Sequence, residues 1–351
     1  MSMNSIDNPS IEFSASIQPL DVTEAMKSLL WNRQLLKYIG VWPLEISHAF
    51  FLFFFIYLLV HCLLTFAELT LGKHNFDVNM AIIDENVLHL MTLIKITMCW
   101  INRQSLRRLL IEVQDNFLAD NYNTFEKRFI FMKYAKLAKY YFFVAVPSMT
   151  IAIGFYYIQE LISNVKMAMS NSSWSYKLPY KTRTFVDIRD IRIYTCLCIY
   201  QILVPPSIVL GFVGFDCLFT NLAFHITAQF GVLSCMLREI LDDSRGFQCN
   251  MKELVLRHYK LIRQAKTLED KYNVIILQQL MGSTFQLCAS GYYTLLERII
   301  RGSVDRDGLT LFIFCTYAFA VLSTLFIYCY IGECLIQEVI EINCGDTGCF
   351  I

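Results

Sequence analysis

Five long apolar stretches constrain this 351-residue chain more than any other feature of its sequence. Each is long enough to cross the hydrocarbon core of a bilayer as a helix, which takes about 20 mostly apolar residues. They occupy residues 47–70, 140–161, 195–219, 274–296 and 309–334. The stretch 274–296 contains no charged residue, and 47–70 contains only one, Glu68. The sequence therefore predicts a transmembrane helix at each of the five.

A sixth stretch, 78–101, is apolar but contains Asp84, Glu85, His89 and Lys95. A lysine near the centre of a membrane helix costs about 2.5–3.5 kcal/mol on insertion scales. The apolar residues around it can offset that cost, and a long lysine side chain can also extend toward the nearer end of the helix. We expect a sixth transmembrane helix here.

The overall composition agrees with a membrane protein. Hydrophobic residues make up 56% of the chain and charged residues 17%, whereas soluble proteins average about 25% charged residues. Thirty Lys and Arg residues balance thirty Asp and Glu residues, so bulk positive charge for binding nucleic acid is absent. The expected fold class is an all-α, polytopic helical bundle in the lipid bilayer.

The distribution of Lys and Arg over the connecting segments predicts the orientation. The segments on the side of the N-terminus contain 19 Lys and Arg, and those on the opposite side contain 10. Basic residues are enriched in cytoplasmic segments, so the N-terminus is expected in the cytoplasm. The domain organisation is then a cytoplasmic segment (1–46), a bundle (47–334) and a short cytoplasmic tail (335–351).

One independent feature agrees with this orientation. The sequon Asn171-Ser172-Ser173 lies in 162–194, the longest segment predicted outside. Since Asn-x-Ser/Thr is an acceptor for N-glycosylation on extracellular surfaces, Asn171 is a candidate glycosylation site.

Two cytoplasmic segments carry helical patterns of their own. Apolar residues recur at intervals of three and four residues in 104–117 and in 251–268, a spacing typical of amphipathic helices. We expect both segments to continue the membrane helices into the cytoplasm.

The sequence contains none of the motifs of common catalytic sites. A G-x-S-x-G elbow, an HExxH zinc motif, a Walker A loop and a G-x-G-x-x-G turn are all absent, so we expect neither an enzyme nor a cofactor or metal site. Asp84, Glu85 and His89 form a polar cluster at membrane depth, where ionisable residues commonly mark a site. An ion site or ligand contact is one interpretation, and a helix end facing a water-filled vestibule is the other.

Aromatic residues gather in the outer halves of the predicted helices. A small apolar ligand would bind by burying its surface against such rings, with a few polar groups to orient it. The candidate ligand-binding residues are Phe155, Tyr156, Tyr200, Tyr292, Phe314, Tyr317 and His89. Interfacial aromatic belts and ordinary helix packing remain the alternative explanation.

Several local stretches, taken in order, resemble the insect odorant receptor family. LLKYIGVWPLE (35–45) resembles its Gly-x-x-Pro signature, and LPYKTRTFVDI (178–188) its extracellular Leu-Pro-aromatic motif. Residues 215–240 and 258–288 resemble the segments around its fourth and fifth spans, and CYIGECLIQE (329–338) the end of its sixth.

The resemblance implies a multi-pass receptor subunit of the plasma membrane that binds a small volatile organic ligand. It also implies a hetero-tetramer with an odorant receptor co-receptor, which gates a cation channel. Family members continue into a seventh, pore-lining helix, which 339–351 does not supply, so we expect a truncated, non-conducting receptor. A gustatory-type receptor of the same superfamily and a secondary transporter remain alternatives.

Overall fold

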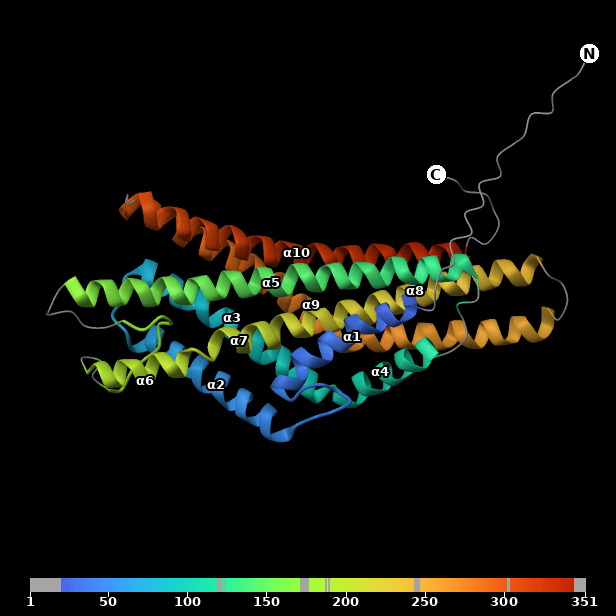
Figure 1. The fold of residues 1–351 in the computed structure, drawn as a ribbon, viewed down its shortest axis with the longest axis horizontal. Coiled ribbons are helices and arrows are strands. Elements are labelled where there is room, and N and C mark those ends of the chain that lie inside the picture. The colour runs from blue at the N-terminus through green and yellow to red at the C-terminus, as the bar shows by residue number, and fades with distance from the viewer. Residues whose placement is uncertain are drawn as a thin grey trace, which may run out of the picture.

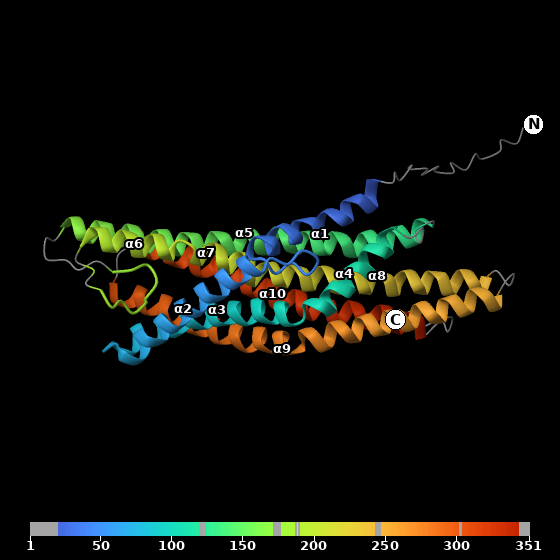
Figure 2. The ribbon, with the colours of Figure 1, turned by 90° about the horizontal axis from the view of Figure 1, so that it is seen from below.

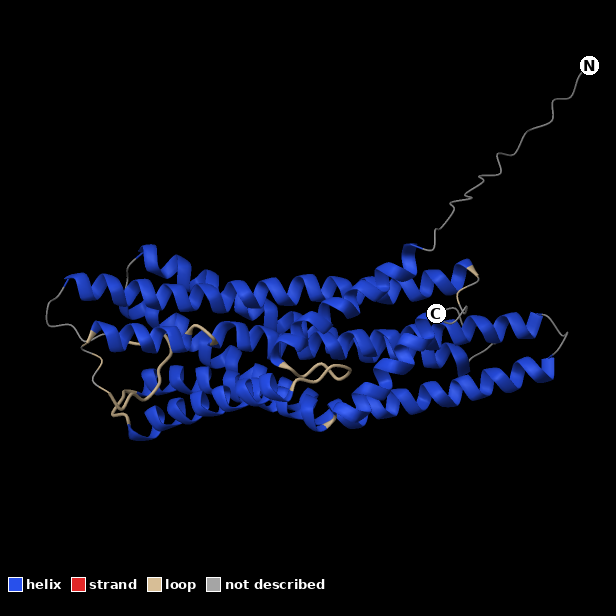
Figure 3. Ribbon diagram, turned by 60° about the horizontal axis from the view of Figure 1, so that its bottom comes forward, coloured by secondary structure: helices blue, strands red, loops and turns tan. Residues whose placement is uncertain are grey.

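The computed structural model describes residues 20–118, 122, 124–170, 177–186, 188, 190–242, 247–301 and 304–343. Every regular element in these residues is helical (Figure 3). The elements are α1 (Leu20–Ile39), α2 (His48–Leu71), α3 (Phe76–Ile101), α4 (Arg103–Leu118), α5 (Phe125–Ser170), α6 (Ile191–Gln201), α7 (Val204–Ile208), the π-helix η1 (Val209–Val213), α8 (Gly214–Asp242), α9 (Phe247–Arg301) and α10 (Val304–Asn343).

Helix α8 forms the centre of an elongated bundle (Figures 1 and 2). It packs against α1, α5, α9 and α10. Nearly every side chain between Phe212 and Cys235 is buried, as expected of a helix that is surrounded by other helices on all sides. The long helices α5 and α10 run side by side along the bundle.

The surrounding helices present large apolar side chains outward. Phe50, Phe53 and Phe66 of α2 and Leu322 and Phe326 of α10 are all more than half exposed. Four helical stretches are long and apolar enough to cross a membrane, namely His48–Leu71, Phe125–Val165, Ile191–Leu241 and Gly308–Ile342. The predicted all-α membrane bundle is thereby confirmed.

The other two predicted spans also coincide with helices, α3 and the second half of α9. In the described residues, neither helix is as apolar as the four stretches above. Helix α3 contains charged residues, and α9 contains several glutamines and hydroxyl residues. Both nevertheless pack alongside the spans: α3 contacts α2 and α9, and α9 contacts α8 and α10. Their crossing of the membrane remains a prediction.

Lys95 of α3 does not extend toward a helix end, as the sequence suggested, but is completely buried. Its Nζ lies 2.6 and 2.8 Å from the two carboxylate oxygens of Asp216 on α8. It also donates to Oε1 of Gln279 on α9 at 2.7 Å, and the Tyr328 hydroxyl of α10 donates to Asp216 at 2.7 Å. Four helices are thus joined by one buried ionic network.

The predicted span 195–219 is a continuous path but not a regular helix. Pro205 and Pro206 have no N–H to donate, and a proline ring clashes with the carbonyl four residues earlier. Helix α6 accordingly ends at Gln201, and the chain passes through α7 and η1 before α8 begins.

The Gly-x-x-Pro signature contains the turn that ends α1. Gly40 has a φ of 80°, a left-handed conformation that glycine adopts without strain. The N–H of Gly40 donates to the carbonyl of Lys37, and that of Val41 to the carbonyl of Leu36, which is the Schellman pattern of a helix end. The turn directs the chain from α1 into α2.

The two segments predicted to be cytoplasmic are helical, as their spacing predicted. Residues 104–117 lie in α4, and 251–268 belong to the same 55-residue helix, α9, as the span 274–296. Two segments predicted outside the bundle also contain helix. Helix α1 lies within 1–46, and α10 continues past residue 334 to Asn343. Residues 344–351 lie outside the described part of the chain.

Candidate ligand-binding site

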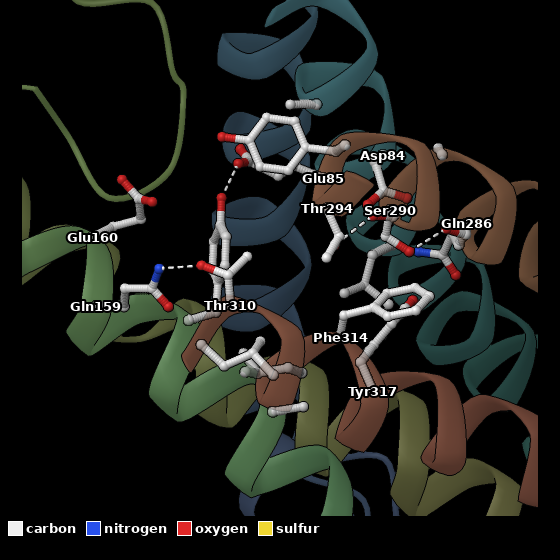
Figure 4. A pocket seen from close by; sticks show the side chains of 18 of the residues that line it. Asp84, Glu85, Gln159, Glu160, Gln286, Ser290, Thr294, Thr310, Phe314 and Tyr317 are labelled. Atoms are coloured by element: carbon white, nitrogen blue, oxygen red, sulfur yellow. Dashed lines mark hydrogen bonds between the residues drawn. The ribbon is translucent and has the colours of Figure 1, made fainter. Parts of the chain in front are cut away.

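A cavity of about 140 Å³ lies between α3, α5, α9 and α10. Tyr180, from the segment that connects α5 to α6, also lines it. The four helices contribute from their ends on the same side of the bundle, which is the outer side in the predicted orientation. Figure 4 shows this cavity at close range.

The lining residues recur at helical spacing on each of the four helices. On α5 they include Tyr156 and Glu160, and on α10 Thr310, Phe314 and Tyr317. Residues three and four positions apart share one face of a helix, so each helix turns one stripe toward the cavity. The same rule selects Asp84 and Leu88 on α3, and Gln286, Ser290 and Tyr293 on α9.

Four of the residues predicted from the sequence meet at this cavity: His89, Tyr156, Phe314 and Tyr317. Asp84 and Glu85, the other members of the predicted polar cluster, line it as well. Among the described residues, no group of three His, Cys, Asp or Glu side chains is arranged to hold a metal ion. The structure thus brings the whole predicted cluster to one cavity.

The structure places the other three predicted residues elsewhere. Phe155 is 42% exposed and packs edge-on against Phe312, on the outer surface of the bundle. Tyr292 is also 42% exposed, and its hydroxyl donates to Asp77. Tyr200 is half-buried against Tyr57, with ring centroids 5.2 Å apart.

Two of these three are direct neighbours of residues that line the cavity: Phe155 precedes Tyr156, and Tyr292 precedes Tyr293. Because successive residues on a helix are rotated by about 100°, a neighbour points to a different surface. A prediction based only on how deep a residue lies in the membrane could not distinguish Phe155 from Tyr156, or Tyr292 from Tyr293.

Hydrogen bonds hold part of the polar lining in place. The Tyr156 hydroxyl of α5 donates to Oε1 of Glu85 on α3, and the backbone N–H of Lys181 donates to Oε2 of the same carboxylate at 3.1 Å. On the opposite side, Nε2 of Gln159 donates to the hydroxyl oxygen of Thr310 at 2.8 Å (Figure 4).

Other polar groups at the cavity have no hydrogen-bond partner among the described residues. Oδ1 of Asp84 and the hydroxyl of Tyr180 are buried without a hydrogen bond, and of the two ring nitrogens of His89 only one faces an acceptor, the backbone carbonyl of Glu85. His89 is only 1% exposed. Leaving a buried polar group without a partner costs about 1–3 kcal/mol of stability. A bound molecule or a water that forms a hydrogen bond with these atoms would recover that free energy.

Tyr180 was not among the predicted site residues, although it is the aromatic residue of the Leu-Pro-aromatic motif. Gln201, at the end of α6, fixes it in place through its side-chain amide. Oε1 of Gln201 accepts the N–H of Tyr180 at 3.0 Å, and Nε2 donates to the carbonyl of Tyr180 at 2.9 Å. This pairing holds the segment between α5 and α6 against the cavity.

The candidate glycosylation site, Asn171, lies outside the described residues.

Comparison with known proteins identifies the family. A family model for the 7tm odorant receptors matches residues 86–343. Odorant receptor 13a of Drosophila melanogaster is 28% identical over 181 residues, which cover 48% of this chain and 40% of that receptor. Odorant receptor 24a of the same species is 21% identical over 281 residues, covering 78% and 69%.

Solved structures show the same fold. The olfactory receptor OR5 from Machilis hrabei superposes with a TM-score of 0.70 at 15% identity, over 92% of this chain and 83% of that one. The same receptor in complex with eugenol gives a TM-score of 0.71 at 14% identity and the same coverage.

These findings confirm the resemblance seen in the sequence and the expectation that the chain is not an enzyme. The chain belongs to the 7tm odorant receptor family.

Proposed function

We propose that this chain is an odorant receptor subunit that binds a small volatile organic molecule between α3, α5, α9 and α10. The observation that supports the proposal is the cavity of about 140 Å³ in a bundle of this family. A cavity of about 150 Å³ lined by apolar side chains holds a benzene molecule. The space therefore suits a compound of about one ring.

The lining supports binding by burial of apolar surface. Ile153, Ile313 and Phe314 supply apolar contacts, and Tyr156 and Tyr317 supply rings with a hydroxyl. Micromolar affinity corresponds to about 8 kcal/mol. A small ligand gains such energy mainly from apolar contact, at roughly 25 cal/mol per Å², while a few polar groups fix its orientation.

The proposal extends to signalling. In the plasma membrane, the subunit would assemble with an odorant receptor co-receptor in a hetero-tetramer and gate a cation channel. Binding can open such a channel only if the ligand has higher affinity for the open state. The family match supports this assignment over the alternatives of a gustatory-type receptor and a secondary transporter.

Odorant-evoked currents test the proposal. The chain is co-expressed with a co-receptor in two forms, as given and fused at its C-terminus to the last helix of a relative. We expect a panel of one-ring volatiles to evoke current in at least the second form. No current from either form, with both proteins at the cell surface, would contradict the proposed channel function.

A variant pair on α10 tests the location of the site. Phe314→Ala removes a ring that lines the cavity and should raise the half-maximal odorant concentration by about tenfold or more, since a large-to-small change there loses several apolar contacts. Phe312→Ala is the matched control, because Phe312 is 50% exposed and packs against Phe155 outside the cavity. Equal shifts in the two variants would place the site elsewhere.

A further inference from the structure

The cavity contains more acidic than basic groups. Asp84, Glu85 and Glu160 line it, and none of the described lining residues is a lysine or an arginine. One cation lies at the rim: Nζ of Lys181 is 5.3 Å from the centroid of the Tyr293 ring. The lining thus offers several carboxyl oxygens to a ligand that donates hydrogen bonds and no basic side chain to an anionic one.

The carboxyl groups on α3 differ in their hydrogen bonds. Both oxygens of Glu85 accept hydrogen bonds, from the Tyr156 hydroxyl and the Lys181 backbone. Oδ1 of the neighbouring Asp84 is buried and has no partner among the described residues. The acceptor that lacks a donor is therefore on Asp84.

His89 is a second, independent sign of a polar ligand. It lies at the cavity and is 1% exposed; one ring nitrogen faces the backbone carbonyl of Glu85, and the other has no described partner. A neutral imidazole has one donor and one acceptor nitrogen, so His89 can accept a further hydrogen bond at the same cavity as Asp84. Figure 4 shows Asp84 on the same side of the cavity as Ser290 and Gln286, opposite Gln159 and Glu160.

The aromatic residues of the cavity suit a cation as well as an apolar group. Tyr156, Tyr293, Phe314 and Tyr317 all line it. The face of an aromatic ring attracts an ammonium group, and more strongly where water is excluded. The cavity thus combines an unpartnered carboxylate oxygen with rings that bind both parts of an aryl-alkyl amine.

We propose that this site selects protonated primary amines, with the ammonium donating to Asp84 and the apolar body against Phe314 and Tyr317. This inference rests on the proposed function, because it uses the same cavity. An aliphatic amine is protonated at neutral pH, since its pKa resembles that of lysine, about 10.4. Its N–H groups form charge-assisted hydrogen bonds with a carboxylate, which are stronger than those of a neutral donor.

Three ligands with one skeleton test the selectivity: 2-phenylethylamine, 2-phenylethanol and phenylacetic acid. Their binding to the purified full chain in detergent is measured by calorimetry at neutral pH. We expect the amine to bind about tenfold or more tightly than the alcohol, because its hydrogen bond joins two charged groups. The acid should bind most weakly.

Two variants on α3 assign the preference to Asp84. Asp84→Asn keeps the shape and removes the charge; it should weaken amine binding about tenfold and alcohol binding much less, and circular dichroism shows whether the variant is folded. Asp77→Asn is the matched control, because Asp77 lies on the same helix but contacts the exposed Tyr292. It should affect neither ligand.

Each other outcome has a defined meaning. If the alcohol binds as tightly as the amine, the amine selectivity is wrong while the proposed odorant site stands. If Asp84→Asn weakens the alcohol as much as the amine, the charge of Asp84 is not the cause and the inference is also wrong. Absence of binding by all three ligands contradicts the inference, and the current measurements then decide the proposed function separately.

Discussion

At the scale of single residues, Lys95 has a partner that a sequence pattern cannot predict. In the sequence it is an isolated charge within an apolar stretch, a position that carries a cost. Its partner Asp216 lies 121 positions away, on another helix. Helical periodicity relates residues a few positions apart and gives no information on such a pair. The buried network therefore became visible only in the structure.

Lys95→Met should destabilise the protein by about 3–5 kcal/mol, because it leaves the buried carboxylate of Asp216 without its counter-charge. The measurement is chemical unfolding of the purified protein in detergent, followed by circular dichroism. The lost stability should show as a lower denaturant midpoint with an unchanged slope.

The double variant Lys95→Met/Asp216→Asn provides the control for that prediction. Neutralising both partners removes the uncompensated charge, and the amide oxygen introduced by Asp216→Asn can still accept the hydrogen bond of Tyr328, so much of the stability should return. A single variant as stable as the wild type, or a double variant no better than the single, would show that the ion pair does not hold the four helices together.

At the scale of elements, the predictable features are those with a local cause. Residues 47–70 almost coincide with α2, since length and apolar composition suffice to define that helix. The stretch 195–219 instead contains an interruption set by Pro205 and Pro206. On α9, Tyr292 and Tyr293 are equally aromatic, yet only Tyr293 lines the cavity, because helix rotation and packing decide which of two neighbours faces inward.

Gln201, the last residue of α6, holds Tyr180 in place, because its side chain forms two hydrogen bonds with the Tyr180 backbone. Gln201→Leu should release the segment 177–186 while the helices remain folded. Leaving the paired backbone groups of Tyr180 unsatisfied costs about 1–3 kcal/mol, so trypsin should cleave after Lys181 or Arg183 about tenfold faster.

Thr182→Val is the matched control for the proteolysis experiment. Thr182 accepts a hydrogen bond from the same amide, but its loss leaves both backbone bonds of Tyr180 in place. Cleavage should stay close to that of the wild type. Equal protection in the Gln201→Leu variant would mean that other contacts hold the segment.

At the scale of the whole molecule, the predicted orientation rests on how 29 Lys and Arg residues are distributed over the connecting segments. It predicts that Asn171 enters the lumen of the secretory pathway and carries a glycan. Treatment with a glycosidase should increase the mobility of the protein expressed in insect cells, and Asn171→Gln should abolish that shift. A glycan acquired at a sequon introduced into the 104–117 segment, but not at Asn171, would reverse the orientation.

The buried ionic network also limits how a ligand travels. On α3, α9 and α10, the residues Lys95, Gln279 and Tyr328 lie farther from the outer end than the cavity residues His89, Gln286 and Tyr317. Lys95 follows His89 by six positions on α3, a rise of about 9 Å. A buried ionic layer therefore lies on the inner side of the cavity and opposes the passage of an apolar molecule in that direction. The residence time of a bound molecule should then depend on the segment that Gln201 holds, so that one glutamine side chain would control how long a ligand stays.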